Sequence, residues 1–236
     1  MTDSPTSTAP SRRLDPVAVL AALAVVGAYA RAIWFTPPER IQGFAQKILY
    51  VHAPAAWVAF LAFGLTALAG AGWLFLKDER LDRFAESSAE VGVVFTTAVL
   101  ITGPLWGRPI WGTWWTWDPR LTMTVVLWTI YAAYLMLRRL SAGDDTTRRY
   151  AAVLGIVGAL NIPLLVLAIR LWRGIHPAVM IAKDPEAGLK DPSMTWALVV
   201  ANVAMALLFD WLVSLRTRLL RVDREVAALE VEELEG

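Results

Sequence analysis

Long apolar runs separated by short polar segments dominate this chain. A helix needs roughly 20 mostly apolar residues to cross about 30 Å of hydrocarbon. Six runs fit that requirement: residues 16–35, 51–76, 91–106, 121–137, 151–171 and 194–215. The third run is the shortest, because Gly103-Pro104 interrupts its end, and without it five spans would put the two ends of the chain on opposite sides. The pattern predicts an all-α integral membrane protein with six transmembrane helices and short amphipathic helices on its outer face.

Composition supports the bilayer as the solvent of this chain. Apolar residues make up 57% of the sequence and the mean hydropathy is +0.50, which excludes a water-soluble globule. The net charge of +1, without a long basic tract, gives no support for nucleic-acid binding. Cysteine is absent, which excludes disulfides, thiolate metal sites and thiol nucleophiles. Because Walker A and GxSxG patterns are also absent, we expect neither ATP hydrolysis nor hydrolase chemistry on this chain.

The positive charges indicate which flanks of the spans face the cytoplasm. Thirteen lysines and arginines lie on the side that would hold both termini, against eight on the other side. The positive-inside rule therefore predicts cytoplasmic termini. We divide the chain into a disordered cytoplasmic tail at 1–15, a six-span membrane domain at 16–215 and a cytoplasmic C-terminal tail at 216–236, which contains a short helix.

Three segments that carry candidate chemistry fall on the outer side: 37–52, 105–120 and 172–193. In the first, Ile41, Phe44 and Ile48 follow a helical spacing with polar residues between them. This pattern predicts an amphipathic helix lying on the membrane surface, which leads to His52 at the start of the second span.

The second segment is rich in tryptophan, with five of the twelve tryptophans of the chain. A helix that begins at Pro109 and ends at Pro119 would place Trp111, Trp114 and Trp115 on one face. Such a face forms a flat aromatic shelf that suits a large planar apolar ligand. The alternative is an aromatic belt that anchors the protein at the membrane interface.

His52 and His176 are the only histidines of the chain, and both lie on the outer side close to prolines. Each alone is an ordinary interfacial polar residue, but as a facing pair they could supply both axial ligands of a haem iron. A zinc site that adds Asp118 or Glu39 is an alternative, although the compact ligand spacing usual for zinc is missing.

Charged neighbours extend this hypothesis. Four outer-side basic residues are candidate partners of the haem propionates, with membrane lipid headgroups as the alternative partner: Lys47, Arg108, Arg120 and Arg173. Asp118 precedes Pro119 and fits the N-cap of the fourth span, while a role in holding Arg120 is the alternative.

The run at residues 111–122, WGTWWTWDPRLT, resembles the WWD signature of the haem-handling proteins of cytochrome c biogenesis. Together with the stretch at 50–55, YVHAPA, and with His176, it is similar to the haem exporter protein C (CcmC) family over nearly the whole chain. The resemblance implies that His52 and His176 are axial ligands of haem b. It also implies a WWD segment that holds the macrocycle, formed by Trp106, Trp111, Trp114, Trp115, Trp117 and Asp118.

The resemblance further implies a multi-pass protein of the bacterial inner membrane that is not itself an enzyme. It would present haem at the periplasmic face to the haem chaperone CcmE, while the ABC transporter subunits CcmA and CcmB use ATP to release the loaded chaperone. A small membrane protein, CcmD, belongs to the same assembly. The alternatives are a haem-conducting channel, a structural membrane subunit, or an enzyme that attaches haem covalently.

Overall fold

The computed structural model describes residues 15–140, 144–172, 176 and 188–235, and within them all regular structure is helical. The six segments long and apolar enough to span a membrane confirm the predicted all-α membrane fold. The elements are α1 (Pro16–Trp34), a short 3₁₀ helix η1 (Phe44–Ile48), α2 (Leu49–Leu76), α3 (Glu79–Trp111), α4 (Pro119–Leu140), α5 (Asp145–Ala159), α6 (Asn161–Leu171) and α7 (Pro192–Glu235).

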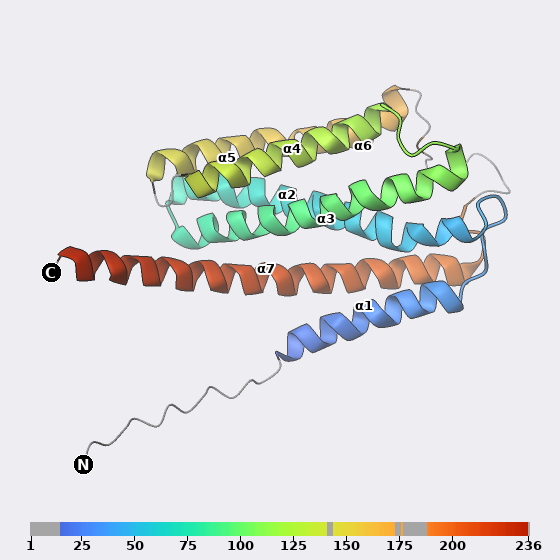
Figure 1. The fold of residues 1–236 in the computed structure, drawn as a ribbon, viewed down its shortest axis with the longest axis horizontal. Helices are drawn as coiled ribbons and strands as arrows, with labels where there is room; N and C mark the ends of the chain where they lie inside the picture. Colours follow the sequence, from blue (N-terminus) through green and yellow to red (C-terminus); the bar gives the residue numbers. More distant parts are fainter. Residues whose placement is uncertain (1–14, 141–143, 173–175, 177–187, 236) are drawn as a thin grey trace, which may run out of the picture.

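The helices run roughly along one axis (Figure 1). The pair α2 and α3 lies in the middle, with α4, α5 and α6 on one side and α7 and α1 on the other. The first residue of α1 and the last residue of α7 lie toward the same end of the bundle. The opposite end, where α3 ends and α4 and α7 begin, is called the site end below.

α3 is longer than the predicted run at 91–106, and it continues through Pro104 and Pro109 to Trp111. A proline in a helix removes one backbone hydrogen bond. In an apolar solvent, however, leaving the helix would expose many more unpaired backbone groups. The helix ends only at Gly112, whose left-handed φ of 76° lets its amide donate to the Arg108 carbonyl at 3.0 Å.

The amphipathic helix predicted over residues 37–52 is wrong for its first part, residues 37–43, which are not helical. Residues 44–52 are helical, but they form η1 and the first turn of α2 instead of one surface helix. The buried carboxylate of Glu39 accepts hydrogen bonds from the amides of Ile41 and Gln42 at 2.9 and 2.6 Å, and Gly43 has a φ of 58°. These features form a turn, because a side chain that binds nearby amides competes with helix formation.

The middle of the bundle is held by an aromatic contact between α2 and α4. The rings of Phe63 and Tyr131 stack at 3.7 Å with an interplanar angle of 13°. The Tyr131 hydroxyl donates to the Gly155 carbonyl of α5 at 2.8 Å. A buried tyrosine hydroxyl usually finds a hydrogen-bond partner, and this bond fixes the position of the Tyr131 ring.

The end of the bundle opposite the site end is held by ion pairs. Arg138 of α4 donates to both carboxylate oxygens of Asp82 on α3, at 2.6 and 2.9 Å, and to Glu86 at 2.6 Å. Arg224 of α7 reaches the same two carboxylates at 2.9 and 3.1 Å, and Glu79 at 3.1 Å. These pairs hold α7 against α3 at Arg224, and the short helix predicted in the C-terminal tail is the end of α7, which continues to Glu235.

Candidate functional site

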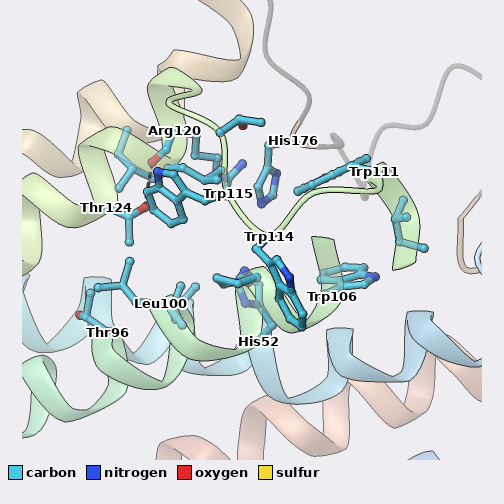
Figure 2. A pocket seen from close by; sticks show the side chains of 18 of the residues that line it. His52, Thr96, Leu100, Trp106, Trp111, Trp114, Trp115, Arg120, Thr124 and His176 are labelled. Atoms are coloured by element: carbon cyan, nitrogen blue, oxygen red, sulfur yellow. Dashed lines mark hydrogen bonds between the residues drawn. The ribbon is translucent and has the colours of Figure 1, made fainter. Parts of the chain in front are cut away.

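A cavity opens at the site end between two walls. One wall comes from α2 and α3, and the other comes from the segment 112–118, α4 and α6, together with His176. The space between the walls, counted together with the part that is open to solvent, is about 960 Å³, and most of its lining is apolar. The tryptophans at 106, 111, 114 and 115, both histidines and Arg120 are among the lining residues (Figure 2).

His52 lies in the first turn of α2 and is buried, with an exposed fraction of 9%. Its Nδ1 is 2.9 Å from the hydroxyl of Thr102 on α3. The edge of Trp106 packs against its ring at a centroid distance of 5.7 Å. The ring also lies close to Gly103 of α3, since a Cβ at this position would lie 3.4 Å from the His52 Cε1. The imidazole is thus held on three sides, and its remaining side faces the cavity.

His176 faces His52 across the cavity (Figure 2). The ring centroids are 6.4 Å apart with an interplanar angle of 32°, and Trp111 lies 6.3 Å from the His176 ring. Two imidazoles that bind one metal from opposite sides, with bonds of about 2.0 Å and a nitrogen about 1.1 Å from each ring centre, have centres about 6.2 Å apart. The spacing of the histidine pair therefore fits one metal ion between them.

The zinc alternative finds no support in the described residues. Among them, no group of three or more histidine, cysteine, aspartate or glutamate side chains could hold a metal ion. Glu39 is engaged in its turn, and the Asp118 Oδ1 accepts hydrogen bonds from the amides of Arg120 and Leu121. Asp118 therefore caps α4, with Pro119 at the first helical position, as the sequence predicts.

The tryptophans reach the cavity differently from the shelf that the sequence predicts. A single helix between Pro109 and Pro119 is wrong, because residues 112–118 are not helical. Trp111 lines the cavity from the end of α3, and Trp114 and Trp115 do so from the following segment. Trp117 is 75% exposed and is not among the lining residues, although its ring packs edge-on against Trp115 at 5.8 Å.

The four basic candidates differ in what they contact. The Lys47 amine donates to the carbonyls of Ala32, Ile33 and Thr36 at the end of α1. Arg108 is exposed and donates to the Gly112 carbonyl. Of the three basic candidates that the structure describes, Arg120 alone is among the residues that line the cavity. Arg173 lies outside the described residues.

Comparison with known proteins agrees with the resemblance seen in the sequence. The family model described as heme exporter protein C (CcmC) matches residues 3–232. The chain belongs to this family. The heme exporter protein C of Bradyrhizobium diazoefficiens is 36% identical over 213 residues, which cover 89% of this chain and 78% of that protein. The heme exporter protein C of Rhodobacter capsulatus is 34% identical over 226 residues, covering 94% and 93%. A putative cytochrome c biosynthesis ccmC-like mitochondrial protein of Marchantia polymorpha is 34% identical over 152 residues, covering 64% of each chain.

This member of the heme exporter protein C family has further polar groups at the site that sequence reasoning missed. Thr102 contacts His52, and Gln42 accepts a hydrogen bond from the Trp106 indole at 3.0 Å. The Trp115 Nε1 and the Thr116 hydroxyl are buried at the cavity wall without a hydrogen-bond partner among the described residues. Sequence offers little signal for such residues, since threonine and glutamine in a membrane helix or a loop have no distinctive spacing.

Proposed function

We propose that this protein binds haem b between His52 and His176 at the periplasmic face of the bacterial inner membrane and presents it for cytochrome c biogenesis. The observation that carries the proposal is the 6.4 Å separation of the two imidazoles across an apolar, tryptophan-lined cavity. Two histidines on opposite faces of the haem would supply both axial ligands of the iron, and aromatic side chains would contact the porphyrin. The name that its relatives carry, heme exporter protein C, agrees with this cargo.

Among the described basic residues, Arg120 is the proposed partner of a haem propionate. Its guanidinium lies at the cavity wall and interacts with Asp118. Arginine and a carboxylate form strong, often bidentate hydrogen bonds. The Trp115 indole and the Thr116 hydroxyl are two further donors at the same wall. Lys47 and Arg108 already bind backbone carbonyls, so they are not proposed as propionate partners. A propionate contact of Arg173 stays a prediction from the sequence.

The proposed orientation of the protein in the membrane follows from the distribution of its basic residues. Along the sequence, thirteen basic residues lie on the flanks that lead to the termini, against eight on the other flanks, and this bias favours a cytoplasmic location for the termini. The cavity then faces the periplasm, where the haem chaperone CcmE is the proposed acceptor. CcmA, CcmB and CcmD are the proposed partners within the membrane assembly, and ATP hydrolysis is assigned to CcmA and CcmB.

The alternatives account for fewer observations. A haem-conducting channel needs polar groups through the depth of the bundle, whereas Phe60, Leu127 and Leu165 give the helical part of the lining a mostly apolar character. Its two threonines, Thr96 and Thr124, donate their hydroxyl protons to carbonyls of their own helices. A purely structural membrane subunit leaves the facing histidines and the cavity unexplained.

The test is the absorption spectrum of the purified protein, co-expressed with CcmE, for wild type and for His52→Ala and His176→Ala. We expect low-spin haem bands in the wild type, and loss of haem or altered bands in each variant. Trp196→Phe is the control, because this tryptophan of α7 is exposed and is not among the lining residues, and its spectrum should equal that of the wild type. Haem retained with unchanged bands in both histidine variants would refute the ligand pair.

A second comparison tests the propionate partner. Arg120→Met should weaken haem binding about 10- to 150-fold, since a hydrogen bond to a charged group contributes about 1.5–3 kcal/mol. Arg108→Met removes an exposed arginine that binds a backbone carbonyl, and it should leave haem binding unchanged. Equal haem affinities for the two variants would contradict the assignment of Arg120.

A further inference from the structure

The hydrogen bond between Thr102 and His52 has a defined donor and acceptor. The Thr102 hydroxyl carries one proton, and it lies 2.7 Å from the Ala98 carbonyl one turn earlier in α3. A hydroxyl that donates to this carbonyl can only accept a hydrogen bond from the His52 Nδ1, which is 2.9 Å away. The proton of the neutral imidazole is then on Nδ1, and the lone pair is on Nε2.

The surroundings of His52 reinforce this arrangement. The ring is packed edge-on against Trp106, and it lies close to Gly103 of α3. A flipped ring would turn a carbon toward the Thr102 hydroxyl and leave the nitrogen proton without this acceptor. Packing and hydrogen bonding therefore favour the same orientation.

From this geometry we infer that Thr102 is a positioning residue, which holds His52 in the Nδ1-protonated tautomer so that Nε2 is the atom that binds the haem iron. The inference rests on the proposed function and adds the residue that positions one of the two ligands. A hydrogen bond to the outer nitrogen of a ligating histidine fixes its tautomer and raises its basicity, and loss of such a partner typically weakens metal binding about 10- to 100-fold.

The experiment compares Thr102→Val with Thr102→Ser by haem titration and by the midpoint potential of the bound haem. Valine keeps the shape but removes the acceptor, so we expect affinity to fall about 10- to 100-fold. The potential should rise, because a less basic imidazole stabilises ferric iron less. Serine keeps the hydroxyl and should restore both values.

Two controls separate this role from a structural one. Thr129→Val removes an equivalent hydroxyl, which binds the carbonyl four residues earlier on an exposed face of α4, and should change neither value. In a His52→Ala background, Thr102→Val should have no further effect, since the two residues act as one unit.

The outcomes also distinguish this inference from the proposed function. If His52→Ala and His176→Ala alter the haem bands but Thr102→Val matches the wild type in affinity and potential, the positioning role is wrong and the ligand pair stands. If Thr102→Ser behaves like Thr102→Val, the hydroxyl is not the determinant and the role is also wrong. If the histidine variants bind haem as the wild type does, the proposed function itself fails.

Discussion

Gly92 of α3 is the point at which one added methyl group should disturb the bundle most clearly. A Cβ at this position would lie 2.6 and 2.9 Å from two ring carbons of Phe63 and 3.0 Å from the Cβ of Ala62. Carbon atoms pack best at about 3.5–4.0 Å, so Gly92→Ala requires the Phe63 ring to move by about 0.9 Å. This ring is fully buried and stacks on Tyr131 at 3.7 Å, and the Tyr131 hydroxyl is bonded to two backbone carbonyls.

Overpacking of a well-filled core typically costs about 1–3 kcal/mol, and we expect Gly92→Ala to lower the free energy of unfolding by this amount. Gly64→Ala is the matched control. It also adds a methyl group to a membrane-spanning helix, but its Cβ would meet nothing within 4 Å. The difference between the two variants therefore isolates the contact with Phe63 from any general effect of alanine in a helix.

The free energy of unfolding can be measured in mixed micelles by titration with SDS, followed by tryptophan fluorescence. Gly92→Ala should have a lower free energy of unfolding than Gly64→Ala. Equal free energies, within about 0.5 kcal/mol, would show that Phe63 can move without loss and that the α2–α3–α4 packing is looser than described.

Three further variants test other parts of the molecule. In Gly107→Ala the new methyl would lie 2.9 Å from the Trp111 ring, so this ring must shift within the cavity wall and haem occupancy in the absorption spectrum should fall several-fold. Lys47→Met should lower the free energy of unfolding by about 1–3 kcal/mol, because the end of α1 loses its cationic donor, while haem affinity stays unchanged. Arg138→Met should lower the free energy of unfolding by up to about 3 kcal/mol, because Asp82 stays buried with fewer partners, and Asp82→Asn in the same chain should recover part of the loss.

The fold was predictable because each span is encoded locally. A run of apolar residues that is long enough to cross the bilayer must be helical, since the solvent satisfies no backbone group. The helix ends were harder to predict, because prolines such as Pro104 and Pro109 end helices in water but are retained in α3. The turn at Glu39 depends on one buried carboxylate, which hydrophobic spacing does not reveal.

The composition of the candidate site was predictable, but its construction was not. Rare residue types identified His52, His176 and the tryptophans as candidates. The order of the predicted spans put them on one side of the membrane, and the positive-inside rule indicated that this is the outer side. Sequence could not show that Trp111 reaches the cavity from a helix while Trp114 and Trp115 do so from an irregular segment. Nor could it separate Arg120 from the other basic residues, because capping of backbone carbonyls by Lys47 or Arg108 is visible only in three dimensions.

The cavity lies between two layers that are joined elsewhere. Its walls belong to α2 and α3 on one side and to α4 and α6 on the other. These layers contact each other deeper in the bundle through Phe63 and Tyr131, and at the far end through Asp82 and Arg138. An apolar cavity lacks the contacts that would fill it, so the packing elsewhere must offset that loss. A change at the far end should therefore reduce stability and leave haem affinity unaltered. A change at His52 should reduce haem affinity and leave stability unaltered.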